Sequence, residues 1–209
     1  MGMPSFQSEK TVMDRQQIRQ QIRQQRRQLT EDQRQIASHS LSDQISRSSL
    51  FRNSKRIAFY IPSDGEVDLL PLLTHAWRCN KECFLPVLGP YKSRRLWFLP
   101  VTSTTSLVSN RFGILEPEHA KNQRCFKPIS LDLILMPLVA FDMQGNRLGM
   151  GGGFYDRTLS FLLTRKIWNK PHLMGTAYAF QKIEGLNKQK WDVSINSIAT
   201  DEGILSFPL

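Results

Sequence analysis

Apolar residues recur at helical spacing in the first quarter of the chain. Between residues 13 and 29, Ile18, Ile22 and Leu29 fall within roughly 40° of one another on a helical wheel with about 100° per residue. A second helix is predicted over residues 30–48, because Thr30 begins a Thr-Glu-Asp-Gln sequence with the spacing of a capping box. The chain is therefore expected to open with two amphipathic helices.

Short apolar runs that predict β-strands follow these helices and alternate with further helical segments. Strands are expected at residues 56–62, 82–88, 96–100, 131–137, 173–178, 197–200 and 203–207, and helices at 68–80 and 154–165. Residues 101–128 match neither period and predict irregular structure. The alternation predicts an α/β fold, with a mainly parallel sheet, helices on both faces and a Rossmann-like three-layer arrangement. We expect a flexible tail at residues 1–10 and a single domain over 11–209.

The composition is that of a globular protein, with 209 residues, 40% of them hydrophobic and 22% charged. No apolar run approaches the roughly 18 residues needed to cross a bilayer, and no secretory signal is visible, so we expect a cytoplasmic protein. The cysteines Cys79, Cys83 and Cys125 are odd in number and form no Cys-x-x-Cys pair, which predicts free, buried thiols.

The positive charge is concentrated near the N-terminus. The net charge is +10, and the segment from Lys10 to Arg56 carries eleven Lys or Arg but four acids. Such a block attracts nucleic acid, a membrane surface or a small phosphorylated ligand. On the helical wheel Arg15, Arg19 and Arg26 share one face beside the apolar stripe, where they could bind phosphate at the rim of a cleft. A solvated basic face is the alternative.

The clearest candidate for chemistry is the segment 145–157, which links the strand at 131–137 to the helix at 154–165. Gly149, Gly151, Gly152 and Gly153 fall within five residues. Since glycine tolerates positive φ and has no side chain, successive backbone N–H groups can close around an anion. The start of the following helix and the carboxyl end of the preceding strand favour the same place. The segment predicts a phosphate cradle, with a flexible turn as the alternative.

Two familiar phosphate loops do not match this segment. It lacks the Gly-Lys-[Ser/Thr] of a Walker loop, and residues 169–171 supply no acid at the position that a dinucleotide-binding fingerprint requires. A nicotinamide cofactor is therefore disfavoured. Asp156 is better placed as a ligand for Mg²⁺ held on bound phosphates.

The segment Asn146-Arg147-Leu148-Gly149-Met150-Gly151-Gly152-Gly153-Phe154-Tyr155-Asp156-Arg157 resembles the signature of the 5-formyltetrahydrofolate cyclo-ligases, also called 5,10-methenyltetrahydrofolate synthetases. The resemblance is to the bacterial type, because Met150 and Gly152 stand where animal members carry basic residues. It extends from about residue 15 to residue 201. It includes Asp64-Gly65-Glu66, the segment 136–142 and Trp191-Asp192.

The resemblance implies an activity and a set of site residues. ATP would phosphorylate the formyl oxygen of 5-formyltetrahydrofolate, N10 of the folate would attack that carbon, and phosphate would leave, with Mg²⁺ as cofactor. The implied catalytic residues are Arg147, Tyr155 and Asp156, and the metal ligands are Asp156 and Asp192. The implied ATP contacts are Arg15, Gln16, Arg19, Arg147, Leu148, Gly149, Met150, Gly151, Gly152, Gly153, Phe154 and Tyr155. The implied folate contacts are Ile61, Glu66, Met150, Gly151, Gly152, Gly153 and Phe154.

Other interpretations remain for individual residues and for the whole chain. Asp192 could be a surface acid beside a core Trp191, and Glu66 could be a helix N-terminal charge ahead of Asp68. A nucleic-acid-binding protein is a second hypothesis, although the basic region holds one aromatic residue, Phe51, and no known motif. A phosphosugar- or acyl-CoA-handling enzyme is a third. We expect a monomer whose partners are small molecules, ATP and reduced folate, rather than nucleic acid or membrane.

Overall fold

A computed structural model describes residues 14–90, 92–118, 125–164 and 170–207. Its helices are α1 (Arg15–Gln28), α2 (Glu31–Arg47), α3 (Ser49–Asn53), α4 (Leu70–Arg78) and α5 (Phe154–Leu159), with 3₁₀ turns at Pro128–Ser130, Ser160–Thr164 and Ala179–Gln181. Its strands are β1 (Arg56–Ala58), β2 (Glu82–Leu88), β3 (Leu96–Val101), β4 (Leu107–Ser109), β5 (Leu115–Pro117), β6 (Leu133–Pro137), β7 (Ala140–Phe141), β8 (Arg147–Leu148), β9 (His172–Thr176), β10 (Ser197–Ala199) and β11 (Ile204–Ser206). The expected tail at 1–10 lies outside the described residues.

Seven strands form one sheet in the order β11-β10-β9-β6-β1-β2-β3. The neighbouring pairs from β10 to β2 are parallel, and only the edge strands β3 and β11 run antiparallel to their neighbours. The predicted mainly parallel α/β sheet is confirmed, although β1 is shorter than the run at 56–62 indicated.

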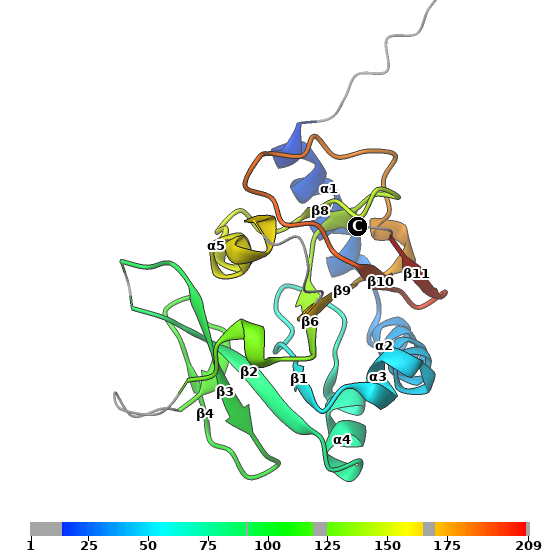
Figure 1. Cartoon of the computed structure of the whole chain (residues 1–209). Coiled ribbons are helices and arrows are strands. Elements are labelled where there is room, and N and C mark those ends of the chain that lie inside the picture. Colours follow the sequence, from blue (N-terminus) through cyan, green and yellow to red (C-terminus); the bar gives the residue numbers. More distant parts are fainter. Residues whose placement is uncertain (1–13, 91, 119–124, 165–169, 208–209) are drawn as a thin grey trace, which may run out of the picture.

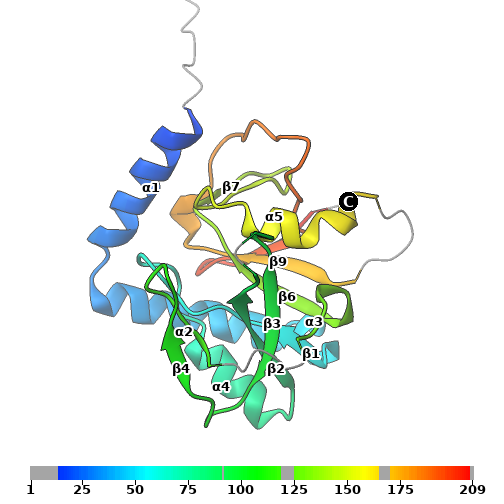
Figure 2. The same cartoon turned by 90° about the vertical axis from the view of Figure 1, so that its left-hand side faces the viewer.

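Side chains alternate between the two faces of the sheet and build two apolar layers. Ile57, Leu133 and Leu135 lie in the layer that packs against α2, α3 and α4. Ala58 and Ile134, next to them in sequence, lie in the opposite layer with Leu159 of α5 and the segment around 193–198. Both cartoons show α2–α4 on one side of the sheet and α5 on the other (Figures 1 and 2). Helices cover both faces, as predicted.

The N-terminal helices follow the predicted pattern. Ile18 and Ile22 are buried against Val139, Ala140 and Leu148, which belong to the β7–β8 hairpin and the residue before it. Both α1 and α2 begin with a capping box, that of α2 formed by Thr30 and Gln33 as expected. Docking through this stripe places α1 along one flank of the molecule, beside β7 (Figure 2).

The expectation of irregular structure at 101–128 is wrong for residues 107–109 and 115–117, while residues 119–124 lie outside the described residues. Strands β4 and β5 form an antiparallel hairpin there, with Asn110 and Ile114 bonded at its turn. The side chains of β4 are all exposed, and β5 buries the consecutive residues Glu116 and Pro117, so the hairpin shows no apolar alternation that the sequence could reveal. The predicted helix at 154–165 also ends early, since α5 stops at Leu159 and continues as a 3₁₀ turn.

The chain order of the strands creates a switch point between β1 and β6. After β1 the chain continues to β2 on one side, whereas after β6 it continues to β9 on the other. The two connections diverge and leave a crevice at the carboxyl ends of these strands, which is where open α/β sheets bind ligands. Arg147 and residues 149–157, which follow β6 in the chain, lie at this crevice.

Gly175, in β9, offers a test of the packing between the sheet and the layer that contains α5. A Cβ atom there would lie 2.6 Å from Leu138 Cδ2, 2.7 Å from Ile198 Cδ1 and 2.9 Å from Ile195 Cδ1. We expect Gly175→Ala to lower the free energy of unfolding in urea by about 1–3 kcal/mol through overpacking. Gly185→Ala, where nothing lies within 4 Å of the added carbon, is the matched control. Equal stability of the two variants would contradict this packing.

Candidate functional site

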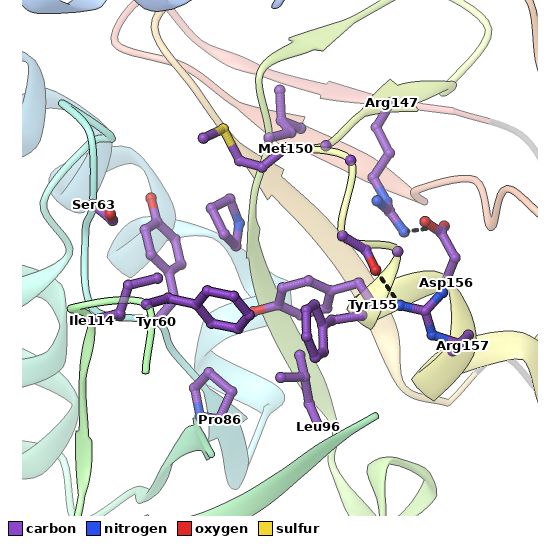
Figure 3. A pocket seen from close by; sticks show the side chains of 18 of the residues that line it. Tyr60, Ser63, Pro86, Leu96, Ile114, Arg147, Met150, Tyr155, Asp156 and Arg157 are labelled. Atoms are coloured by element: carbon purple, nitrogen blue, oxygen red, sulfur yellow. Dashed lines mark hydrogen bonds and ion pairs between the residues drawn. The ribbon is translucent and has the colours of Figure 1, made fainter. Parts of the chain in front are cut away.

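A cavity of about 1150 Å³ opens at the switch point. It is enclosed by α1, the loop after β1, the carboxyl ends of β2 and β6, the β4–β5 hairpin, the segment 147–157 and residues 189–192. In Figure 3 Tyr60 and Ile114 line one side of the cavity, and Tyr155, Asp156 and Arg157 line the other. A cavity of this size can take more than one small molecule.

The glycine segment forms one wall of this cavity in a conformation that requires glycine. The φ angles of Gly151 and Gly153 are 98° and 62°, in the region that side chains disfavour. The backbone N–H groups of 149–153 donate no hydrogen bond within the part of the chain that the structure describes. Arginine side chains engage the carbonyl groups instead, Arg19 that of Gly149 at 2.9 Å and Arg157 that of Gly152. Unused amide donors beside cations form an anion-binding surface.

Arg147 and Asp156 form an ion pair at the base of this wall. The Arg147 Nη2–Asp156 Oδ1 distance is 2.6 Å (Figure 3). The same oxygen accepts from the backbone N–H of Val193 at 3.2 Å. The Arg147 side chain is 4% exposed. The pair fixes the orientation of the carboxylate, and among the described residues the other oxygen of Asp156 accepts no hydrogen bond.

The N-terminal end of α1 delivers two arginines to the cavity. Arg15 Nη1 lies 3.0 Å from Asp192 Oδ2, which also accepts from the N–H of Gln189. Partial burial, and then the charge of Arg15, lower the pKa of Arg19 from its ordinary value. Within the described residues the Arg19 side chain donates only to a neutral carbonyl, so its positive charge is available to an anionic ligand.

The exposure of Trp191 and Asp192 is the reverse of what the surface-acid interpretation of Asp192 requires. Trp191 is 64% exposed, whereas Asp192 is 9% exposed. The interpretation of Asp192 as a surface acid beside a core tryptophan is therefore wrong. Its burial and its ion pair with Arg15 place it at the cavity instead.

A tight turn after β1 supplies the carboxylates on the other side. Asp64 binds arginines of α1, and Glu66 accepts the N–H of Ser63 at 3.0 Å through Oε2. Burial raises the pKa of Glu66 to about 7, against the lowering effect of Arg26. Arg26 is completely buried, which corrects the expectation that it would lie at the rim. At the start of α4 the N–H of Leu70 donates to Asp68 at 2.9 Å, so Asp68 rather than Glu66 caps that helix.

Two tyrosines, the buried Tyr60 and the partly buried Tyr155, face the same region. Burial, followed by the charge of Glu66, raises the pKa of both Tyr60 and Tyr155, so both hydroxyl groups are neutral. The Tyr60 hydroxyl donates to the Val67 carbonyl at 2.8 Å and accepts from Thr176 at 3.0 Å. Tyr60 is held rigidly, whereas the described residues give the Tyr155 hydroxyl no hydrogen bond.

The β4–β5 hairpin completes the cavity, and sequence reasoning missed it. The Phe112 ring meets the Phe154 ring edge-on at a centroid distance of 5.8 Å. Glu116 is buried and accepts from the N–H of Leu88 and from Asn110. Arg23, Tyr60 and Trp191 were also missed as lining residues. Arg23 lies one helical turn after Arg19, and that spacing was the available signal.

Most residues implied by the resemblance gather at this one cavity. The lining residues among them are Arg15, Arg19, Ile61, Glu66, Arg147, Gly149, Met150, Gly151, Gly152, Gly153, Phe154, Tyr155, Asp156 and Asp192. Gln16 and Leu148 do not line it, since Gln16 is exposed on α1 and Leu148 is buried against Ile18 and Ile22.

The carboxylates of the cavity suit a metal cation only when a bound ligand supplies further oxygen atoms. No group of three or more His, Cys, Asp or Glu residues that could hold a metal occurs in the described residues. Within the described ranges, Asp156 and Asp192 each keep one oxygen outside any hydrogen bond, and Mg²⁺ commonly uses one or two carboxylates together with substrate phosphates. The two acids fit such a shared site.

Of the cysteines, only Cys83 is fully buried, so the prediction of three buried thiols is wrong for Cys79 and Cys125.

Proteins of known function with similar sequences share one name, 5-formyltetrahydrofolate cyclo-ligase. The chain is 42% identical over 187 residues to the 5-formyltetrahydrofolate cyclo-ligase of Haemophilus influenzae, covering 88% of this chain and 96% of that protein. It is 41% identical over 147 residues to the cyclo-ligase of Escherichia coli K12, covering 69% of this chain and 76% of that protein.

The helices of the described residues include none long and apolar enough to cross a membrane.

Solved structures give the same result. The NMR structure of Aquifex aeolicus 5,10-methenyltetrahydrofolate synthetase matches with a TM-score of 0.78 and 32% identity, over 93% of each chain. A synthetase structure from Mycoplasma pneumoniae, with a TM-score of 0.69 and 24% identity, covers 90% of this chain and 99% of that one and supports the fold. The family model described as the 5-formyltetrahydrofolate cyclo-ligase family matches residues 11–201. The chain therefore belongs to the 5-formyltetrahydrofolate cyclo-ligase family and is an enzyme of the ligase class.

Proposed function

We propose that this enzyme converts 5-formyltetrahydrofolate to 5,10-methenyltetrahydrofolate with ATP, releasing ADP and phosphate. The observation that carries the proposal is the wall formed by residues 149–153. Its backbone N–H groups are unused within the described residues, and two of its carbonyl groups, those of Gly149 and Gly152, accept from Arg19 and Arg157. Such a surface suits the phosphates of a nucleotide. The names of the relatives supply the folate as the second substrate.

The reaction needs positioning and charge stabilisation more than covalent chemistry by the protein. The formyl oxygen attacks the γ-phosphorus and ADP leaves, which turns that oxygen into a good leaving group. N10 then attacks the formyl carbon, the C–O bond breaks to release phosphate, and N10 loses its proton. Arg19 and Arg147 lie where they would offset the phosphate charge, and the neutral hydroxyl of Tyr155 could donate a hydrogen bond.

Magnesium would bind with the nucleotide. In this proposal Asp156 and Asp192 contribute the carboxylate oxygens that lie outside their ion pairs, and the cation supplies charge neutralisation of the phosphates. Ile61 and Glu66 would contact the folate from the opposite wall. The carboxylate of Glu66 can accept N–H donors of the folate ring.

The placement of the basic residues favours small molecules over nucleic acid. Arg15, Arg19 and Arg23 line the cavity and Arg26 is buried, so much of the charge of α1 faces inward. Binding of nucleic acid needs exposed cations that meet a phosphate backbone. We accordingly propose a cytoplasmic monomer that acts on ATP and a reduced folate, without a nucleic-acid or membrane partner.

The experiment that tests the function follows the absorbance of the methenyl product. Purified protein is incubated with 5-formyltetrahydrofolate in the presence and absence of ATP, and with Mg²⁺ or a chelator. We expect product only with ATP and Mg²⁺, together with one ADP for each methenyl group. Folded protein that forms no product under any of these conditions would overturn the proposal, and product without ATP would refute the phosphorylation step.

The carboxylate of Asp156 is expected to be essential for turnover. Replacing it in Asp156→Asn removes the charge that orients Arg147 and would hold Mg²⁺, so we expect kcat/KM to fall by about 100-fold or more, the scale of a lost catalytic alignment. Asp43→Asn, at a side chain that is 69% exposed on α2, is the control. Steady-state kinetics and thermal melting separate this loss from unfolding. Activity within a few fold of the parent enzyme would remove Asp156 from the site.

Arg19 is expected to contact ATP rather than folate. The Arg19→Ala variant loses a cation beside residues 149–151, so the KM for ATP should rise roughly 10- to 100-fold, the effect of losing a hydrogen bond to a charged group. The KM for folate should change much less. Arg47→Ala, at a side chain that is 80% exposed on α2, provides the comparison. Equal rises in both KM values would argue against a phosphate contact.

A further inference from the structure

Three arginines of α1 converge on a single carboxylate of the turn after β1. Asp64 Oδ2 lies 2.5 Å from Arg23 Nε and 3.1 Å from Arg26 Nη2, while Oδ1 lies 2.6 Å from Arg27 Nη2. Burial alone would raise the pKa of Asp64, but the hydrogen bonds from Arg23 and Arg27 and the charge of Arg26 hold it below its ordinary value. Asp64 is therefore a fixed anion that ties the turn to α1.

The turn itself is shaped to sit on Arg26. Asp64 and Gly65 have φ angles of 49° and 73°, and the N–H of Glu66 donates to the Ser63 carbonyl at 3.0 Å, which closes a tight turn. A Cβ added to Gly65 would lie 3.3 Å from the Arg26 carbonyl oxygen and 3.4 Å from Arg26 Cβ. This close approach means that the turn and α1 are seated against each other at Arg26.

Arg26 also faces the second carboxylate of the turn. Its side chain is 0% exposed, that of Glu66 is 9% exposed, and Arg26 Nη1 lies 3.9 Å from Glu66 Oε1. Nε and Nη1 of Arg26 are buried without a hydrogen-bond partner in the part of the chain that the structure describes. A buried guanidinium costs free energy unless carboxylates lie close to it, so the pair Asp64 and Glu66 is what makes its position tolerable.

We propose that Arg26 is a positioning residue, which seats the turn Ser63–Glu66 against α1 and keeps the Glu66 carboxylate charged and oriented at the cavity wall. This inference rests on the proposed function in one respect, namely that Glu66 contacts the folate. The helix that offers Arg15 and Arg19 to the nucleotide would then also set the folate side of the site. Arg26 acts through Glu66, and it does not itself line the cavity.

The charge balance around Glu66 makes the proposal measurable. The groups that face it are Arg26 from α1, Asp64 from its own turn, Tyr60 after β1 and Tyr155 from α5. Of these, Arg26 is the cation that lowers the pKa of Glu66, whereas Asp64 and burial raise it to about 7. Removing the Arg26 charge must therefore raise this pKa further, and protonated Glu66 accepts N–H donors poorly.

The experiment compares Arg26→Met, which removes the charge, with Arg26→Lys, which keeps it. Arg27→Met is the matched control, because Arg27 binds the same Asp64 from a side chain that is 60% exposed, and no ion pair links it to Glu66. The first readout is an NMR titration of the Glu66 carboxyl carbon, assigned with Glu66→Gln, which requires no substrate. The second is the pH profile of kcat/KM for 5-formyltetrahydrofolate, with the KM for ATP measured in parallel. Thermal melting verifies folding.

We expect wild-type kcat/KM for the folate to rise with pH through about 7, as Glu66 ionises. In Arg26→Met the Glu66 titration and this limb should both move to higher pH, by about one unit or more, so that kcat/KM near pH 7 falls about fivefold or more. The KM for ATP should stay within about twofold, well below the effect of a lost charged hydrogen bond. Arg26→Lys should restore most of the wild-type profile, and Arg27→Met should leave it in place.

Different failures point to different errors. If Arg26→Met and Arg27→Met give the same Glu66 titration, the positioning role of Arg26 is refuted, whatever the enzyme does. If Arg26→Met does not fold, the Arg26→Lys variant still decides. This variant keeps the positive charge, so a Glu66 titration that moved up by about one pH unit in it would refute the role. If the wild-type enzyme forms no methenyl product, the proposed function fails, while the NMR titration still tests the link between Arg26 and Glu66.

Discussion

The cations buried or partly buried inside the protein need anions beside them, and this requirement organises the site. A guanidinium taken out of water loses its hydration, so its position is stable only beside carboxylates or other acceptors. Arg26 meets Asp64, Arg15 meets Asp192, and the buried Arg147 of β8 meets Asp156. These pairs join α1, the turn after β1, the segment after β6 and the residues before β10, although the chain separates these parts widely.

One cation differs from this pattern. Within the described residues Arg19 donates to the neutral carbonyl of Gly149, and partial burial and the charge of Arg15 lower its pKa. Its positive charge lies beside backbone N–H groups that make no hydrogen bond in the described chain. An anion at this point would satisfy the amides and the guanidinium together. The proposed nucleotide therefore completes an electrostatic arrangement that the protein alone leaves open.

Local patterns in the sequence predicted those parts of the structure that local physics determines. The stripe of Ile18 and Ile22, the capping box at Thr30 and the apolar run at 131–137 all formed as expected, and the glycine segment lines the cavity. The β4–β5 hairpin could not be predicted, since β4 is exposed throughout and the buried residues of β5, Glu116 and Pro117, are consecutive and not alternating apolar positions. The burial of Arg26 escaped prediction for another reason, because it depends on Asp64, a partner 38 residues away.

The ion pairs also determine which oxygen atoms of Asp156 and Asp192 are available to bind a metal cation. Arg147 and the N–H of Val193 engage the same oxygen of Asp156, and Arg15 and the N–H of Gln189 engage the same oxygen of Asp192. Each carboxylate is thus oriented before any ligand arrives and keeps its second oxygen for another partner. With a cationic arginine on each acid, the two carboxylates would attract Mg²⁺ only weakly, and phosphate oxygens would have to supply the remaining ligands. We infer that metal and nucleotide would enter together, which follows from the same pairing of charges that holds α1 on the protein.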